Sequence, residues 1–201
     1  TDVLPKCLMP INGVPLLEYW LASIYKLGMQ DVLVNVHYRS ADVIDFLSRP
    51  RFSNWVTYVE ENHLLGTAGT IRANQNFLKD SSCFLVHADN WCSCDLQSFL
   101  NYHRYDRPSN TLITMMTFQT KTPESCGILE LNKDGIVTAF HEKVKNPPGN
   151  IANGAIYILS KNFLRLFEND FKSAKDFSND VIPDIVGKIF TYHTSAELID
   201  I

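Results

Sequence analysis

Two patterns in the sequence predict an α/β fold with a doubly wound, mixed and mainly parallel sheet. Short apolar runs alternate with segments of helical periodicity up to about residue 105, which is the pattern of strands joined by helical crossovers. After Asn110 the chain is rich in β-forming residues and contains a hairpin turn, which predicts an inserted β-hairpin region. The 201 residues, 45% of them hydrophobic and 20% charged, are enough for one domain with its own core.

The first part of the chain reads as alternating helices and strands. Apolar side chains recur with helical spacing after Pro15, which suits the start of a helix, and Gly28 suits its end. The predicted helices are 15–27, one that Ser40 caps, 67–78 and one that Asp95 opens; the predicted strands are 32–36, 55–59 and 83–87.

The second part is β-rich. Segments 126–132 and 136–142 flank Lys133-Asp134-Gly135, in which the glycine suits the positive φ of a hairpin turn. The other predicted elements are strands 111–118, 153–159, 189–193 and 197–201, and helices 161–167 and 179–188.

The composition argues against nucleic-acid binding and against a membrane protein. The formal net charge is −4, from 18 Lys and Arg against 22 Asp and Glu, and no basic cluster occurs that would neutralise a phosphate backbone. No run reaches the roughly 18 apolar residues that cross a bilayer, and no signal-peptide pattern opens the sequence. We therefore expect small-molecule partners, with no nucleic acid and no membrane.

Cysteine usage points to a reducing compartment. Five cysteines, an odd number in a chain that needs no disulfides, predict reduced thiols in a cytoplasmic protein. Cys92 and Cys94 are close in sequence, but no second pair stands at zinc-ligand spacing, so a zinc site is not favoured.

Charged and polar residues follow the predicted strands. Ligands of open α/β sheets bind outside the carboxyl ends of the strands, so residues at these ends are candidates for binding. They are Glu60-Glu61, Asp89-Asn90, Glu142-Lys143 and Asp200, with Lys6 ahead of the first helix and the glycine-bracketed turn 65–69 ahead of the third. Carboxylates suit a divalent cation and lysines suit phosphate. Taken singly, each could equally be a turn pair, a tight turn or a solvated surface pair.

Taken together and in order, these residues resemble the motifs of the sugar nucleotidyltransferases, also called nucleotide-sugar pyrophosphorylases. Within that family the chain is most similar to mannose- and heptose-1-phosphate guanylyltransferases. The similar segments are Leu4-Pro5-Lys6 through Leu17, Glu61 through Gly69, Asp89-Asn90, Cys126-Gly127-Ile128, Phe140-His141-Glu142-Lys143, Asn153-Gly154-Ala155-Ile156-Tyr157 and Ile199-Asp200-Ile201. One departure is Ala88, which stands where the family usually has glycine before the metal-binding aspartate.

The resemblance implies a Rossmann-like, GT-A-type nucleotide-diphospho-sugar transferase fold in which the hairpin region serves the sugar. It also implies transfer of a nucleotidyl group from a nucleoside triphosphate to a sugar 1-phosphate, with Mg²⁺ as cofactor, in nucleotide-sugar and polysaccharide biosynthesis, and it leaves room for a homo-oligomer. The implied catalytic residues are Lys6, Asp89 and Lys143; the nucleotide-binding residues Lys6, Glu61, Gly66 and Thr67; the sugar-phosphate-binding residues Asn90, Gly127, Glu142, Lys143 and Asn153; and the metal ligands Asp89 and Asp200.

The residue five before Gly66 predicts the base. In the resembling family this position faces the hydrogen-bonding edge of the base, and enzymes for uridine or thymidine triphosphate commonly have glutamine there. Here it is Glu61. An ionised carboxylate only accepts hydrogen bonds, and it matches the adjacent N1–H and amino donors of guanine. We therefore favour GTP.

Other functions stay open at this stage. A GT-A glycosyltransferase would usually carry Asp-x-Asp, which is absent around Asp89, and a non-catalytic nucleotide-sugar-binding regulatory subunit would lose phosphate or metal groups that are present here. A plain phosphate-binding scaffold would not explain the Glu-Lys and Asn-Gly segments. The resemblance begins and ends inside motifs, without an initiator Met. We therefore expect 1–201 to be a single nucleotidyltransferase catalytic domain that lacks its N-terminal Gly-rich loop and a C-terminal segment.

Overall fold

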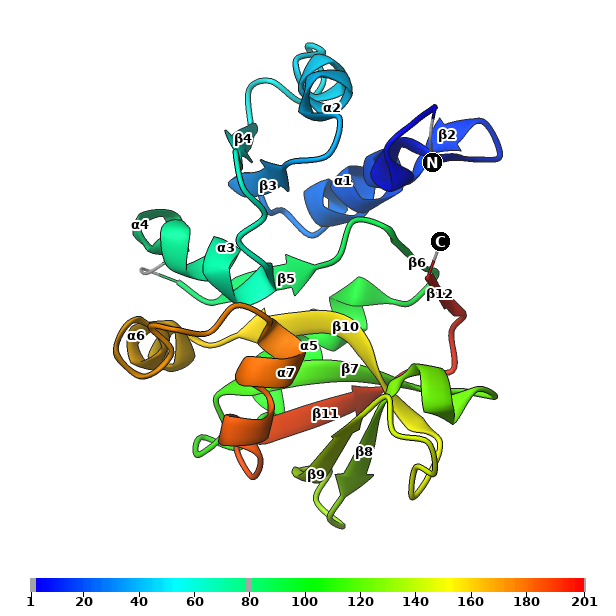
Figure 1. Ribbon diagram of the computed structural model, residues 1–201, viewed down its shortest axis with the longest axis vertical. Coiled ribbons are helices and arrows are strands. Elements are labelled where there is room, and N and C mark those ends of the chain that lie inside the picture. The colour runs from blue at the N-terminus through cyan, green and yellow to red at the C-terminus, as the bar shows by residue number, and fades with distance from the viewer. Residues whose placement is uncertain (1–2, 79–80, 201) are drawn as a thin grey trace. The chain divides into compact units, whose positions relative to one another are not determined.

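The computed structural model describes residues 3–78 and 81–200, except for the side chain of Asp200. The chain divides into two compact units (Figure 1). Unit 1 consists of Thr1–Leu65, Ala88–Cys92 and Ile199–Ile201, and unit 2 of Gly66–His87 and Ser93–Leu198. Each unit has its own hydrophobic core, and each is described separately.

Unit 1 contains short paired strands and two helices. Strands β1 and β2 pair antiparallel, β3 and β4 pair parallel, and β6 pairs with β12, whose last residues belong to this unit. The elements are η1 (Lys6–Leu8), β1 (Pro10–Ile11), β2 (Val14–Pro15), α1 (Leu16–Lys26), β3 (Val32–Val36), α2 (Ser40–Leu47), β4 (Val56–Glu60), β6 (Asn90–Cys92) and β12 (Leu198–Asp200).

The parallel pair β3–β4 positions the polar residues of this unit. Apolar side chains of α1, α2 and both strands form one buried cluster, which includes Leu21, Phe46 and Val36. Val36 lies opposite Glu60 in the register, so both strands end at the same edge. His37 and Glu61 follow these ends, as expected where ligands bind outside the carboxyl ends of parallel strands.

Unit 2 is built on a six-stranded mixed sheet. The strand order is β11-β7-β10-β8-β9, and β5 pairs with β10 (Figure 1). The β11–β7 pair is parallel, whereas β10 is antiparallel to β5, β7 and β8, and β8 is antiparallel to β9. The elements are α3 (Thr67–Ala73), α4 (Gln75–Leu78), β5 (Cys83–Val86), α5 (Leu96–Tyr105), β7 (Ile113–Gln119), η2 (Pro123–Ser125), β8 (Gly127–Leu131), β9 (Val137–Glu142), β10 (Ile151–Leu159), α6 (Lys161–Asp170), α7 (Phe177–Asp180), η3 (Pro183–Ile185) and β11 (Ile189–His193).

Helices bury both faces of this sheet. Alternate residues of a strand point to opposite faces. In β7, Thr114 bonds to His103 of α5, whereas Met115 belongs to the apolar core that contains Phe163 of α6 and Phe177 of α7. Burial on both faces explains why β7 reads as one continuous run of β-forming residues and not as a polar–apolar alternation.

The structure confirms the α/β class, the mixed sheet and the hairpin around Gly135, whose φ is +74°. The helix predicted over 179–188 is wrong. Asp176 caps a short α7 instead, and Pro183 begins the separate turn η3, because proline lacks the N–H that would continue a helix. The helix predicted over 67–78 is interrupted at Asn74, between α3 and α4. Ser40 does not cap α2, since its hydroxyl donates to Glu60 Oε1.

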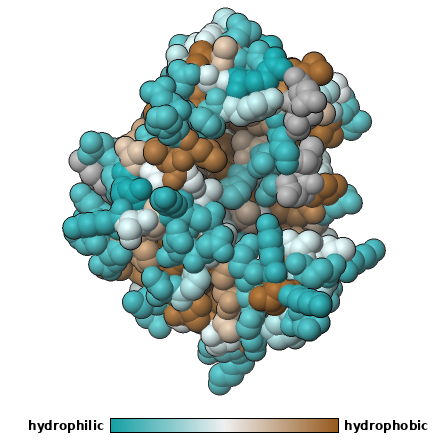
Figure 2. Space-filling model, in the orientation of Figure 1, coloured by the Kyte–Doolittle hydropathy of each residue, from teal (hydrophilic) through white to brown (hydrophobic). Residues whose placement is uncertain are grey.

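Among the described residues, no helix is both long enough and apolar enough to cross a membrane. On the face drawn in Figure 2, hydrophilic side chains predominate and hydrophobic ones form separate patches.

Burial of His103 makes the stability of the fold depend on pH. Its Nδ1 lies 2.8 Å from the hydroxyl oxygen of Thr114, and burial, together with Arg107 and Arg104, lowers the pKa of His103 from 6.5 to about 4. As the pH falls from 6.5 towards 4, the unfolded chain takes up a proton that the folded chain does not. We expect up to about 3 kcal/mol of stability, present above pH 6.5, to be lost over this window.

Urea unfolding between pH 4 and 8 measures this loss. His103→Gln keeps a hydrogen-bonding side chain without a titrating group, so its stability should vary less with pH than that of the wild type. Identical pH profiles for the two proteins would contradict the assignment.

Candidate sugar-phosphate and nucleotide sites

A close approach between β8 and β9 positions Glu142. Gly127 lies opposite Glu142 in the hairpin register. A Cβ on Gly127 would stand 2.5 Å from Glu142 Oε2 and 2.7 Å from two carbons of the Phe140 ring. Only the absence of a side chain at residue 127 therefore lets the carboxyl of Glu142 lie across β8.

Three charges influence one another around Glu142. Partial burial raises the pKa of the Glu142 carboxyl, the positive charge of Lys143 opposes this rise, and the negative charge of Asp176 adds to it. Lys143 is exposed, and its backbone has a left-handed φ of 48° at the end of β9. Its N–H donates to the carbonyl of Cys126 at 3.2 Å, which fixes the turn from which the lysine side chain projects.

Asn153 is tied to the buried Tyr157. The Asn153 amide Nδ2 donates to the Tyr157 hydroxyl at 2.7 Å, and its Oδ1 accepts the N–H of Ala155 at 3.0 Å. These contacts span a register irregularity between β10 and β7, where Ala155 has a φ of 53°. Tyr157 is 1% exposed and also bonds to the Ser178 side chain, and burial raises the pKa of its hydroxyl.

The glycine-bracketed turn lies at the start of α3 and contacts a distant segment of unit 2. Gly66 has a φ of +76°, and a Cβ there would stand 2.4 Å from the carbonyl oxygen of Lys175. That oxygen accepts the N–H of Ala68 at 2.9 Å. The hydroxyl oxygen of Thr67 accepts the N–H of Phe177 at 2.7 Å. Both residues predicted to bind nucleotide thus take part in packing within unit 2.

Glu61, in unit 1, makes polar contacts through its N–H, its carbonyl oxygen and its carboxylate. Its N–H donates to the Val36 carbonyl at 2.8 Å, and its carbonyl oxygen lies 2.7 Å from His37 Nδ1. The side chain is buried, and its Oε2 accepts the N–H of Leu65 at 3.2 Å. The carboxylate therefore closes the loop 61–65, the segment that the sequence assigns to the base.

Lys6, Asp89 and Asn90 also lie in unit 1. Burial raises the pKa of the Cys7 thiol to about 11, and the charge of Asp89 adds to that rise. Asp89 is therefore within electrostatic range of Cys7, the residue after the exposed Lys6 in η1. Asn90 begins β6, and its carbonyl accepts the indole N–H of Trp20 at 2.8 Å.

The oxygen ligands near β6 fit magnesium. Asp200 ends β12, the partner strand of β6, and its side chain lies outside the described residues. Within the described side chains, no group of three or more His, Cys, Asp or Glu could hold a metal ion. Mg²⁺ commonly takes one or two protein carboxylates and completes its shell with water and substrate phosphates, so aspartates such as Asp89, directly before β6, are ligands of the right kind.

The cysteines are not all reduced. Cys92 and Cys94 are disulfide-bonded, whereas Cys7, Cys83 and Cys126 are free. The prediction of five reduced thiols is therefore wrong for these two residues, which only one residue separates in the sequence.

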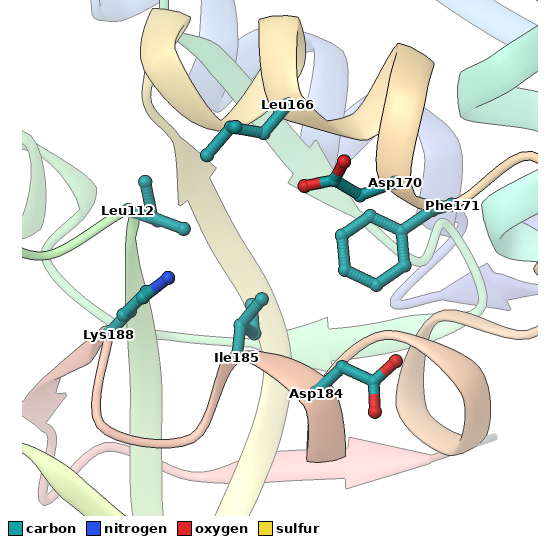
Figure 3. Close-up of a pocket in the computed structure, with 7 residues that line it drawn as sticks. All are labelled: Leu112, Leu166, Asp170, Phe171, Asp184, Ile185 and Lys188. Carbon is teal, nitrogen blue, oxygen red and sulfur yellow. The ribbon is translucent and has the colours of Figure 1, made fainter.

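A hollow elsewhere in unit 2 contains none of the predicted site residues. It measures about 220 Å³. The side chains that line it come from α6 and the residue after it, from η3 and from the loops that lead into β7 and β11 (Figure 3). They are Leu112, Leu166, Asp170, Phe171, Asp184, Ile185 and Lys188.

The sequence analysis did not single out Tyr157, Asp176 or Ser178. Tyr157 stands in an apolar stretch, four residues after Asn153. A buried hydroxyl needs a hydrogen-bond partner, so this tyrosine could have been predicted to bond to a nearby polar side chain. Asp176 and Ser178 precede the helix that was predicted over 179–188, in a stretch with no predicted element, so the bond between Ser178 and Tyr157 could not be predicted.

Comparisons with solved structures show that two other proteins share this fold. The chain is similar to HddC from Yersinia pseudotuberculosis complexed with GMP-PN, with 24% identity, a TM-score of 0.79 and coverage of 98% of this chain and 84% of that one. A putative glucose-1-phosphate thymidylyltransferase from Bacillus anthracis in complex with a sucrose has 19% identity, a TM-score of 0.84 and coverage of 100% and 82%.

The family model described as nucleotidyl transferase matches residues 1–195, so the chain belongs to that family. A mannose-1-phosphate guanylyltransferase from Mycobacterium tuberculosis is 27% identical over 80% of this chain and 44% of that protein. A D-glycero-alpha-D-manno-heptose 1-phosphate guanylyltransferase from Campylobacter jejuni is 26% identical over 87% of this chain and 73% of that protein. The chain spans about half the length of most curated relatives it matches.

Gly127 gives a direct test of the arrangement around Glu142. In Gly127→Ala the new methyl group must displace the Glu142 carboxyl or the Phe140 ring, and overpacking of this kind costs about 1–3 kcal/mol. Gly149→Ala is a matched control, because a Cβ there meets nothing within 4 Å. Urea unfolding should show a loss of stability only for Gly127→Ala, and equal stability of the two variants would refute the close approach.

Proposed function

We propose that this chain transfers a nucleotidyl group from a nucleoside triphosphate, with GTP favoured, to a sugar 1-phosphate, giving a nucleotide-diphosphate sugar and pyrophosphate. The observation that carries the proposal is the polar cluster of unit 2, where the Glu142 carboxyl lies over Gly127 close to Lys143 and to the pair Asn153–Tyr157. A sugar phosphate needs hydrogen-bond acceptors for its hydroxyl groups and a positive charge for its phosphate. Glu142 can supply the first and Lys143 the second. Membership of the nucleotidyl transferase family supports the reaction class.

The proposed reaction requires the protein to bind both substrates and to compensate the negative charge of their phosphates. A sugar phosphate is already an anionic nucleophile, so the chain need not supply a general base. Its task is to hold two polyanions in line and to offset their repulsion. In our proposal Lys143 lies against the sugar phosphate and Lys6 against the triphosphate, while Glu142 and Asn153 bind sugar hydroxyls. Asn153 can offer its second amide hydrogen, since the first is donated to Tyr157, and a second lone pair on its Oδ1 beside the bond from Ala155.

We further propose that the sugar is a manno-configured hexose or heptose and that the base is guanine. The names of the curated relatives from M. tuberculosis and C. jejuni support both choices. For the base, the loop 61–65 presents a carboxylate and not an amide, and a carboxylate has enough lone pairs to accept from Leu65 and from a ligand.

For the metal, we propose that Asp89 and Asp200 hold Mg²⁺, which when bound neutralises charge on the reacting phosphates. Asp89 directly precedes β6, and Asp200 ends β12, the strand that pairs with β6; aspartate oxygens are ligands that Mg²⁺ prefers. We also propose that 1–201 belongs to a single nucleotidyltransferase catalytic domain and that the protein works in the cytoplasm, where nucleoside triphosphates are available.

A panel of nucleotides tests the proposed reaction and base together. With α-D-mannose 1-phosphate as acceptor, pyrophosphate release should be fastest with GTP, by about 10-fold or more in kcat/KM over UTP and dTTP. The reason is that uracil and thymine carbonyls facing a carboxylate lose hydration without gaining donors. Glu61→Gln should lose this preference, since it keeps an oxygen for Leu65 but not the charge.

Glu60→Gln is the matched control for this panel, because it removes the neighbouring charge from a side chain that bonds to Ser40. It should keep the GTP preference. A wild-type enzyme that prefers UTP or dTTP would contradict the assignment of the base, and a full-length protein that releases no pyrophosphate with any nucleotide would contradict the proposed reaction.

The metal proposal predicts a selective effect of Asp89→Asn. Asparagine keeps the shape but removes the charge that balances a divalent ion, so turnover should fall on the order of 10²–10³-fold and respond only to higher Mg²⁺. Asp95→Asn is the control, because asparagine replaces an aspartate helix cap well. Normal turnover of Asp89→Asn at low Mg²⁺ would exclude Asp89 as a ligand.

A further inference from the structure

Glu61 is held to β3 through both of its backbone polar groups. β3 and β4 run side by side in the register that sets Val36 opposite Glu60 (Figure 1). Beyond this last pair, the Glu61 N–H donates to the Val36 carbonyl at 2.8 Å, and the Glu61 carbonyl oxygen lies 2.7 Å from His37 Nδ1. The imidazole of His37 thus makes the second of two contacts that extend the pairing of the strands to Glu61.

The contact between His37 and Glu61 fixes which nitrogen of His37 carries the hydrogen. A carbonyl oxygen only accepts hydrogen bonds, so Nδ1 is the donor. His37 is exposed, whereas Glu61 is only 5% exposed, and a carbonyl in a buried residue is costly to leave without a donor. Loss of the imidazole would therefore release the Glu61 backbone from one of its two contacts with the end of β3.

The same backbone carries the carboxylate that we assign to the base. Glu61 Oε2 accepts the N–H of Leu65 at 3.2 Å, so the side chain turns over the loop 61–65. Guanine offers two adjacent donors, the N1–H and the 2-amino group, and a carboxylate accepts from both only when its two oxygens are aligned with them. The alignment of this carboxylate depends on where the Glu61 backbone is held.

We propose that His37 is a positioning residue of the base site, and that its Nδ1–H holds Glu61 so that the carboxylate reaches the 2-amino group of guanine as well as the N1–H. The proposal rests on the proposed function and refines it. It assigns the discrimination between guanine and hypoxanthine, which lacks the amino group, to a hydrogen bond that the nucleotide does not touch. His37 acts through Glu61 and needs no contact with the nucleotide.

Binding of GTP and of ITP, whose base is hypoxanthine, tests this role. By isothermal titration calorimetry, the full-length protein should bind GTP about 10- to 100-fold more tightly than ITP, the usual scale for a hydrogen bond to a charged group. His37→Ala should bind the two nucleotides equally. His193→Ala is the control, because it removes another exposed histidine, whose Nδ1 contacts the Thr117 hydroxyl, and it should keep the wild-type ratio.

Two amide substitutions separate the position of the donor from its polarity. The amide nitrogen of asparagine is as many bonds from Cα as histidine Nδ1, whereas that of glutamine is one bond further. His37→Asn should therefore keep the preference for GTP over ITP, and His37→Gln should lose it. Should His37→Ala not fold, these two variants decide the proposal. A merely structural effect would lower the affinity for GTP and ITP alike and leave their ratio unchanged, which would overturn the positioning role.

A double variant tests whether His37 acts through Glu61. Glu61→Gln alone should already remove the preference for GTP over ITP, so adding His37→Ala should change the ratio no further, and a further change would refute the proposal. A wild type that prefers GTP to UTP but binds GTP and ITP equally would overturn this proposal alone. A wild type that prefers UTP or dTTP, or that binds no nucleotide, would overturn the proposed function as well.

Discussion

The hydroxyl of Tyr157 is buried at the centre of unit 2, and a buried polar group is costly unless it is hydrogen-bonded. Its partners, Asn153 and Ser178, come from β10 itself and from α7. The bonds to Tyr157 therefore orient the amide of Asn153, next to the irregular register of β10, and hold Ser178 of α7 against β10. The polar cluster that we assign to the sugar phosphate is a consequence of this single requirement.

The electrostatics of the cluster follow from what surrounds it. Glu142 is partly desolvated, has one cation next to it in Lys143, and is near a second carboxylate in Asp176. A ligand that brings hydroxyl donors to the carboxylates and an anion to the lysine would relieve these costs together. The partly desolvated carboxylate and the neighbouring lysine thus suit the hydroxyl groups and the phosphate of a sugar phosphate, and this is the physical basis of the proposed function.

Local sequence predicts the elements whose determinants are local. The bounds of β3 and β11 agree with the strands predicted over 32–36 and 189–193, and Gly135 lies in the turn of the hairpin that sets Gly127 opposite Glu142. The helix predicted over 179–188 is wrong although its apolar residues recur with helical spacing. Asp176 caps a helix that begins earlier, and Pro183 cannot continue that helix.

The candidate site could be predicted only where its residues are close in sequence or belong to recognisable motifs. Glu142 and Lys143 stood out as a pair, whereas the contact of Thr67 with Phe177 joins segments that no local pattern connects. The same contact gives the glycine-bracketed turn a packing role that the motif alone does not reveal.

The most direct test of the account is to map where a sugar phosphate binds. Backbone amide NMR spectra recorded while α-D-mannose 1-phosphate is added should show the largest shifts at Gly127, Lys143 and Ala155, the amides around the proposed cluster. Shifts confined to unit 1, or to Leu112 and Lys188 beside the separate hollow, would contradict the assignment of the sugar-phosphate site.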